Sequence, residues 1–566
     1  MGSSLRPALR LLGLLLLLPA LGVAQDKPSD GRNAADEASE LKTVEVSRAY
    51  EPKVEDAEKT NFIPPLDDTV VPAPVFTYSL IQRPVHSLIT LRPLPAARMG
   101  DEAPEELSNW YLRLGFGNYL SPLGELYYSS DQGKHFTLGA HLRHASDWGK
   151  VKLRGDEDAP AKHSDTRLGI FGDGVAWGHG MHGRFDYRHA YDNFYGRLDK
   201  TAGGGGELFL KGTGANTFNG EWRMNTLHMD SSHVHYDGRF RLGGYVDSRD
   251  ASVVVVDASF AGHKYLHSEA LGGQVRIRHF GTKVGSKSRG NTIFSLYPWV
   301  KIFGERWRAW AGIDLTIEGN NGKTFFHFFP HGHVSLDVIK QYMIPYFEVD
   351  SELEVADYQS LRAANPWLRP GLFVWNSPRL LELRFGVKGN LNTSLSYNVS
   401  GSFAVVDSVH VFVNGLTPAG GYSSDFVVEQ DKGQELHLNG EMEYAFGRKF
   451  RLYARGDWWH YKLDKQPIAW HRPTYRLSLN GRYNLRRKIE GSLDLFLEGG
   501  RKARALDGSA IPLRAFPNLN LGFRYQFSDL FGLFVDLRNL LFWQHEVYYL
   551  YPGHRFQALL GVSLNF

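Results

Sequence analysis

The alternation of apolar and polar residues along the last strand constrains this chain more than any other feature of its sequence. Apolar side chains recur at every second position from Phe556 to Phe566, and small or polar residues occupy most positions between them. Period-two alternation is the pattern of a β-strand with one apolar face and one polar face. The same rhythm recurs from Asn109 onward, for example over residues 475–485 and 519–527. The sequence therefore predicts an all-β protein.

Two architectures could contain such strands. In a soluble sandwich the apolar faces of two sheets pack together, whereas in a membrane barrel the apolar face meets lipid and the polar face lines a lumen. Aromatic residues gather near the ends of the expected strands, as at Phe325–Phe326, Trp458–Trp459 and Tyr548–Tyr549, which suits the interfacial girdles of a membrane barrel. No stretch after residue 24 resembles a membrane-spanning helix. We therefore expect a transmembrane β-barrel in the bacterial outer membrane.

The number of strands follows from the succession of hairpins. Counting back from Phe566, with the chain end in the periplasm, predicts about 22 antiparallel strands over residues 106–566, with 14–20 strands as the alternative. Tight turns such as Leu485–Lys488 alternate with longer loops such as 358–378 and 414–432, as expected of periplasmic turns and external loops. Such a barrel would contact outer-membrane lipid and lipopolysaccharide, and it would need barrel-assembly machinery for insertion.

The residues before the barrel differ from the rest in composition. Residues 1–24 combine a basic start, an apolar core at Leu11–Leu18 and small residues before the expected cleavage, which is typical of a secretory signal peptide. Residues 25–105 are rich in Pro, Asp, Glu and Ala, and they contain few aromatics. We expect an extended periplasmic or lumenal segment with a short helix around Lys53–Lys59. Such a segment could bind a periplasmic or lipoprotein partner.

Composition excludes several classes of function. The chain contains no cysteine, which excludes disulfides, thiolate metal sites, a cysteine nucleophile and a lipoprotein anchor. Its formal net charge is +3, from 64 basic and 61 acidic residues, and this balance predicts no general affinity for nucleic acid. No Ser-His-Asp set or other nucleophile motif is recognisable. We therefore expect a protein that is not an enzyme, with an outer-membrane enzyme as a minor alternative, and we expect no cofactor.

The C-terminal region resembles the end of TonB-dependent receptors. In that family an Asn-Leu element ends the penultimate strand, an aromatic loop with Pro-Gly follows, and the final strand closes on Phe. The positions that match here are Asn539, Leu540, Tyr551, Pro552, Gly553 and Phe566. The resemblance implies a receptor-like barrel and says little about its substrate.

A second segment, at residues 46–60, resembles the stretch that precedes receptor-like barrels of Bacteroidetes. Its matching positions are Tyr50, Glu51, Pro52, Asp56, Ala57 and Lys59. The family also carries a folded plug inside its barrel, whereas only about 80 residues lie between the expected cleavage site and the first strand here. Their composition does not suit a compact α+β core, so the sequence predicts a receptor-like barrel that lacks the plug.

Two groups of histidines are candidates for metal binding. Histidines spaced by two lie on one face of a strand and could ligate a metal ion. The candidates are His228, His233, His235, His327, His331 and His333. We favour the interpretation that they line a lumen, a turn or an interface, and we predict no metal site.

Two functions remain open from the sequence. The first is a plugless passage for a solute or an exported molecule, which the charged inward face of the strands favours. The second is a structural or accessory barrel in a larger outer-membrane assembly, such as barrel-assembly machinery, which the proline-rich segment 25–105 favours.

Overall fold

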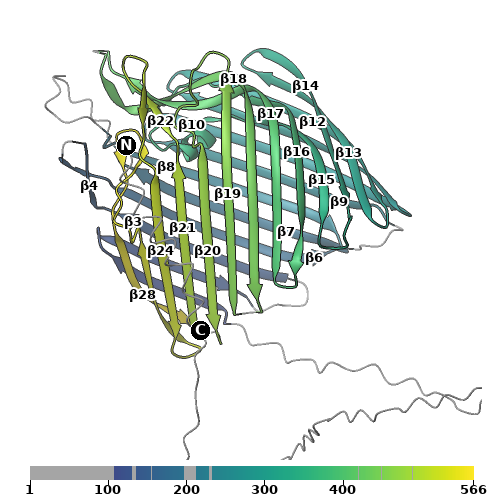
Figure 1. Cartoon of the computed structure of the whole chain (residues 1–566), viewed down its shortest axis with the longest axis horizontal. Coiled ribbons are helices and arrows are strands. Elements are labelled where there is room, and N and C mark those ends of the chain that lie inside the picture. The colour runs from purple at the N-terminus through teal and green to yellow at the C-terminus, as the bar shows by residue number, and fades with distance from the viewer. Residues whose placement is uncertain are drawn as a thin grey trace, which may run out of the picture. The chain divides into compact units, whose positions relative to one another are not determined.

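A closed antiparallel β-barrel dominates the computed structural model of the chain (Figure 1). Its 22 strands form one sheet, as the sequence predicts, and the alternative of 14–20 strands is wrong. The structure describes residues 108–130, 136–154, 156–196, 212–227, 233–418, 420–447, 449–486 and 488–566. The predicted signal peptide, the proline-rich segment, its expected short helix, and all six matching positions between Tyr50 and Lys59 lie outside these residues.

The barrel strands follow the chain in order around the wall. The first eleven are β1 (Trp110–Gly117), β2 (Ser121–Ser129), β3 (Phe136–Asp147), β6 (His163–Ala176), β7 (His179–Asp192), β8 (Thr213–Thr226), β9 (His235–Asp247), β10 (Ala251–Leu266), β11 (Glu269–Val284), β12 (Lys287–Phe303) and β13 (Trp307–Asn320). The second eleven are β14 (Lys323–Leu336), β15 (Ile344–Glu354), β16 (Ser377–Asn392), β17 (Leu395–Leu416), β18 (Tyr422–Phe446), β19 (Phe450–Leu463), β20 (Tyr475–Leu485), β21 (Ile489–Gly499), β24 (Phe516–Gln526), β25 (Phe531–Arg538) and β28 (Gln557–Asn565).

The two ends of the sheet close on each other at a seam between β1 and β28. The Trp110 N–H donates to the carbonyl of Phe566 at 2.8 Å, and the Phe566 N–H donates to the carbonyl of Trp110 at 3.0 Å. The two rings stack with centroids 6.3 Å apart. Closure leaves no unpaired sheet edge, which is the condition for strands to cross a bilayer. The terminal Phe566, which the family resemblance singles out, therefore completes the barrel.

Alternate residues of each strand point to opposite sides of the wall. Phe260 is 56% exposed, Phe385 62% and Leu560 62%, because the outward face of the strands carries no protein cover. Arg455 and Asp457 occupy the opposite face of β19. An apolar outer band around a polar interior is the arrangement of an outer-membrane barrel. The period-two pattern of the sequence thus separates the side chains that face lipid from those that face the lumen.

The two ends of the barrel differ in the length of their connections. At the inner, periplasmic end, which holds Phe566, neighbouring strands join through short turns such as 447–449 and 527–530. The opposite, outer end carries much longer loops, as the sequence predicts. These loops contain the small hairpins β4 (Lys150–Lys152) with β5 (Asp158–Pro160), β22 (Lys502–Arg504) with β23 (Ala510–Pro512) and β26 (Glu546–Tyr548) with β27 (Tyr551–Pro552), and the helix α2 (Tyr358–Ala364). None of the helices in the described residues is long and apolar enough to span a bilayer.

One predicted loop is wrong. The segment 414–432 forms the tips of the two longest strands, since β17 runs for 22 residues and β18 for 25. Val411, Val413 and Phe426 in these tips are fully buried. The hairpin continues beyond the length needed to cross a membrane because other outer loops pack against it and cover its apolar residues.

Candidate functional site

The lumen wall is lined by ion pairs between neighbouring strands. On β19, Arg455 donates to Asp457 at 2.8 Å and lies 3.0 Å from Glu441 of β18. Comparable pairs recur around the wall, including Arg276–Asp257, Arg239–Glu221, Arg384–Glu348, Arg476–Glu498 and Arg524–Glu490. Charged groups that are paired but still partly exposed suit a water-filled interior. The inward face predicted from the sequence is therefore polar along most of the barrel.

Three of the candidate histidines lie on the lumen face of β14. The ring of His327 lies 2.9 Å from Glu318, that of His331 2.9 Å from Asp350, and that of His333 2.9 Å from Glu348. Each ring thus has its own carboxylate partner. In the described part of the chain, no group of three or more His, Asp or Glu side chains is arranged to hold a metal ion.

The other candidate histidines lie near the start of β9. His228 lies outside the described residues. His233 precedes the strand, and His235 is buried at its first position. The ring of His235 stacks on His263 with centroids 5.0 Å apart and meets the edge of Tyr265 at 5.6 Å. These contacts belong to the lumen wall, so the structure does not bring this group together with the histidines of β14.

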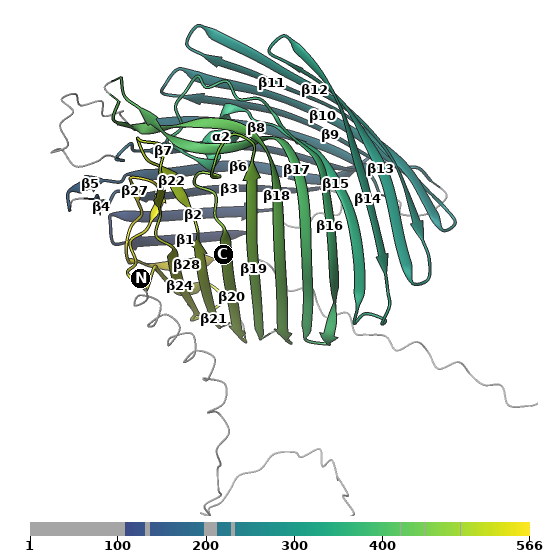
Figure 2. The ribbon, with the colours of Figure 1, turned by 45° about the horizontal axis from the view of Figure 1, so that its top comes forward.

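The helix α2 turns into the barrel and packs against the tips of β8, β9 and β10 (Figure 2). Asp357 caps the helix, and its side chain accepts hydrogen bonds from the N–H groups of Gln359 and Ser360. The helix buries Tyr358 and Leu361 against an apolar patch that includes Val253 of β10. The loop 355–376 therefore covers part of the outer opening.

A buried ion pair fixes this helix to the wall. Arg362 donates to Asp247 at 3.1 Å, and the two side chains are 6% and 0% exposed. The hydroxyls of Tyr245 and Tyr358 donate to the same carboxylate at 3.1 and 3.0 Å. Arg362 also donates to the carbonyl of Thr213 at 3.2 Å. A buried charge pair is tolerated only when its remaining donors and acceptors are satisfied in this way.

Aromatic residues from several outer loops meet around Tyr551. Tyr551 is fully buried, and its ring stacks on Trp367 with centroids 3.9 Å apart. Tyr195, from the loop after β7, packs edge-on against both rings, and its hydroxyl donates to the carbonyl of Pro552 at 3.1 Å. The Trp367 ring N–H donates to the carbonyl of Asn193 at 2.9 Å. We call this assembly, together with α2, the aromatic cap.

The matched C-terminal positions build the base of this cap. Asn539 has a positive φ of 50°, and its side chain donates to the carbonyls of Trp543 at 2.8 Å and His554 at 3.2 Å. The N–H of Leu540 donates to the carbonyl of Leu519 at 2.9 Å. Asn tolerates this backbone region because its short polar side chain can bond locally. The Asn-Leu element therefore turns the chain out of β25.

The Pro-Gly part of the match closes the same loop. Tyr551 and Pro552 form the short strand β27, which pairs with β26, and both are buried. The N–H of Gly553 donates to the carbonyl of His545 at 2.9 Å. The match thus lies in a loop that returns to the wall at β28.

A third loop, 464–474, joins the cap through His471. The His471 Nδ1 donates to the carbonyl of Phe412 at 2.8 Å, and its Nε2 accepts the N–H of Tyr549 at 3.3 Å. The ring must be neutral because Nε2 can accept a hydrogen bond only when it carries no proton. Burial, with the charge of Arg501 as a smaller contribution, lowers the pKa of His471 to about 4. The ring is thus held as a neutral link between the cap and the tip of β17.

Sequence reasoning missed the main residues of the cap. Tyr548–Tyr549 were assigned to an interfacial girdle, but Tyr549 is buried among loop residues and Tyr548 packs on Phe426. In the other two predicted pairs, Trp458 and Phe326 face outward, whereas Trp459 and Phe325 face the lumen. Aromatics inside predicted external loops, such as Trp367, were the available signal, because exposed loops rarely retain them without a packing partner.

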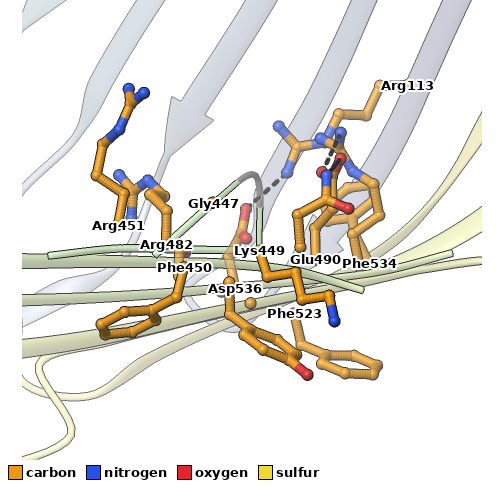
Figure 3. A pocket seen from close by; sticks show the side chains of 16 residues that line it. Arg113, Gly447, Lys449, Phe450, Arg451, Arg482, Glu490, Phe523, Phe534 and Asp536 are labelled. Atoms are coloured by element: carbon orange, nitrogen blue, oxygen red, sulfur yellow. Dashed lines mark hydrogen bonds and ion pairs between the residues drawn. The ribbon is translucent and has the colours of Figure 1, made fainter. Parts of the chain in front are cut away.

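The inner end of the lumen carries a cavity of about 700 Å³ with a basic lining. Five cations and two carboxylates line it, namely Arg113, Lys449, Arg451, Arg482 and Arg524 with Glu490 and Asp536. Figure 3 shows Arg113, Arg451 and Arg482 on the opposite side of the wall from Phe450 and Phe523. This cation-rich lining contrasts with the buried aromatic cap at the other end.

Comparisons with known proteins bear on the fold. No family model and no curated protein matches the sequence. Solved structures do match. The FrpB iron transporter from Neisseria meningitidis superposes with a TM-score of 0.65 at 10% identity, over 82% of this chain and 82% of that one.

Two other solved structures give the same picture. The pyoverdine outer membrane receptor FpvA from Pseudomonas aeruginosa, bound to pyoverdine, matches with a TM-score of 0.60 at 11% identity, over 82% of this chain and 79% of that one. A copper transporter, OprC, matches with a TM-score of 0.60 at 12% identity, over 82% of both chains. At such low identity the likeness concerns the fold alone. This chain has the outer-membrane barrel fold shared by TonB-dependent receptors.

Proposed function

We propose that this protein is a TonB-dependent-receptor-like barrel without a plug, and that it forms a passage across the outer membrane for a polar solute or an exported molecule. The observation that carries the proposal is the wall of partly exposed ion pairs, which lines the interior along most of its length. Such a wall stabilises water and charged solutes inside the barrel. A purely structural barrel of this width has no need of it.

The aromatic cap supports a gated rather than an open passage. It covers part of the outer opening with packed rings and buried hydrogen bonds, so displacing it would widen the entrance. The structural neighbours named as iron and copper transporters support a transport role. The proline-rich composition of residues 25–105 supports a barrel without a compact plug.

Single-channel conductance in a planar bilayer tests the proposal. We expect the full chain to be nearly closed, and a variant with Trp367→Ala and Tyr551→Ala to conduct. Removal of residues 25–105 from this variant should raise the current further if that segment narrows the lumen. Trp177→Ala, at an exposed inner turn, is the control and should leave the current unchanged. A folded barrel that stays silent after both changes would contradict a passage.

A further inference from the structure

The whole chain is nearly neutral, but it contains two regions whose net charges have opposite signs. Residues 25–107 contain 16 acidic and nine basic residues, a net charge of −7. Residues 108–566 contain 53 basic and 45 acidic residues, a net charge of +8. Charges of opposite sign on a barrel and its covalently attached leader favour contact between them, provided that they are within reach.

Several cations of the barrel lie together on one arc of its inner end. Five cations and two carboxylates line the cavity there, and two further carboxylates, Glu443 and Asp494, pair with its arginines. The adjacent turns 447–449 and 486–488 hold Lys449, which also lines the cavity, and add the exposed side chains of Arg486 and Lys488. Among the described residues, no carboxylate forms an ion pair with any of these three.

The paired arginines of the arc also remain open to a ligand. Arg451 contacts Glu443 at 3.2 Å but keeps 70% of its side chain exposed. Arg482 contacts Asp494 at 3.2 Å and is 56% exposed. A guanidinium carries five donors, so one exposed carboxylate partner leaves several of them free. Exposed pairs of this kind are weak and can exchange partners at little cost.

The arc lies on the part of the wall next to the point where the chain enters the barrel. The cavity is lined by β1 and by the strands that follow it around the seam, namely β25, β24, β21, β20 and β19. Four strand spacings separate β1 from β21, a path of about 19 Å. Six spacings, about 29 Å, separate β1 from β19.

The residues just before β1 have the complementary charge. The stretch Asp101–Glu106 contains four carboxylates and no cation. It lies four to nine residues before Trp110, a reach of about 13 to 30 Å in an extended chain. Covalent attachment gives it a high effective concentration at the arc. A free acidic peptide or a lipid phosphate has no such advantage.

We infer that the acidic stretch 101–106 of this chain docks on the basic arc at the inner mouth of the lumen, where Lys449, Arg486 and Lys488 bind its carboxylates. This inference does not depend on the barrel conducting a solute.

Distance measurements between paired spin labels test the docking in the full-length chain. The protein contains no cysteine, so a cysteine that carries a spin label can be introduced at any chosen position. One label replaces Ala103, and the other replaces Ser528 in the turn between β24 and β25. We expect a narrow distance distribution at about 0.1 M salt and its loss at about 1 M salt, where the Debye length falls from about 10 Å to about 3 Å.

Matched variants identify the groups responsible. Neutralising the arc with Lys449→Gln, Arg486→Gln and Lys488→Gln should abolish the narrow distribution. Lys340→Gln, in an inner turn on the far side of the barrel, should leave it intact. Changing the same three cations to Glu should also abolish it, and changing all four acidic residues of the stretch to Lys in that background should restore it.

Two results would overturn the inference. The first is a broad distribution in the unmodified chain at low salt. If vesicles of anionic phospholipid then bind in a way that requires Lys449, Arg486 and Lys488, the turns are assigned to lipid headgroups instead. The second is a narrow distribution that survives neutralisation of the arc.

Discussion

The outer and inner ends of this barrel are held by different forces. At the outer end, the side chains of Tyr551 and Asp247 have no solvent exposure, and rings and buried hydrogen bonds join the loops. At the inner end, short turns carry exposed cations, and the ion pairs of Arg451 and Arg482 remain largely hydrated. The contacts that hold the cap together therefore depend on packing and on buried charge pairs. The charged groups at the inner mouth instead interact with one another and with ligands through solvent.

This contrast predicts how each end responds to conditions. Buried contacts are barely screened by salt, and they fail when a cavity or an unpaired charge is created. Exposed charges are screened within about 8 Å at physiological ionic strength. Mutations and acid should thus act mainly on the outer end, and salt mainly on the inner one.

The largest effect is expected from breaking the buried ion pair of the cap. Asp247→Asn removes the charge that Arg362 faces and leaves a buried guanidinium uncompensated. We expect the cap to lose about 4 kcal/mol of local stability. Limited proteolysis of the loop 355–376 measures it, and Asp507→Asn, at an exposed loop position, is the control. Unchanged protection would show that helix α2 does not depend on the pair.

A smaller loss is expected from the ring stack. Trp367→Ala removes the surface on which Tyr551 packs and should cost about 3 kcal/mol. Hydrogen exchange at the loop 539–556 reports the loss. The outer loops should exchange faster while the barrel strands do not change. Equal acceleration throughout would instead indicate that cap and barrel unfold together.

Acid should loosen the cap through His471. Its pKa is about 4 in the folded protein, against about 6.5 when unfolded. Because folding lowers the pKa of this base, the contribution of the neutral His471 ring to cap stability is complete above about pH 6.5. It is lost as the pH falls toward 4. The full loss is about 3 kcal/mol, and only part of it is felt at pH 5. His471→Gln should remove this pH dependence of loop proteolysis, and a dependence that persists would point to another group.

The smallest stability effect is expected at the inner wall. Arg451→Gln breaks an exposed pair with Glu443 and should change barrel stability by less than about 1 kcal/mol. Its effect on ion selectivity should be measurable, because a lumen cation is lost. Reversal potentials in a salt gradient, recorded in the conducting Trp367→Ala and Tyr551→Ala background, measure the selectivity. A loss of stability comparable to that of Asp247→Asn would contradict the view that the exposed pairs of the inner end are much weaker than the buried pair of the outer end.

The barrel was predictable because its signal is local. Period-two alternation reports which face of each strand meets lipid, and turn residues report where strands reverse, so the strand number follows by counting. Errors arose where burial came from outside the strand. Segment 414–432 was predicted as a loop because the covering residues, such as Trp470, lie elsewhere in the sequence.

The candidate site was predictable only in part. The histidines of β14 share a strand face, as their spacing indicates, yet their carboxylate partners come from β13 and β15. Strand register, which the sequence leaves open, decided that each ring pairs separately. The matched positions Asn539 and Tyr551 indicated the loop before the last strand. They did not indicate which residues that loop packs against.

The sequence by itself determined the architecture of this protein, namely a closed barrel of 22 strands with an apolar outside, a charged lumen and unequal ends. Each of these features follows from periodicity and composition over a few neighbouring residues. Only the tertiary structure decided that the outer loops join in a cap over part of the opening, because the cap brings together Tyr195, Trp367, His471 and Tyr551 from four separate loops. Contacts between distant loops are set by the curvature of the whole wall, and no local pattern records them.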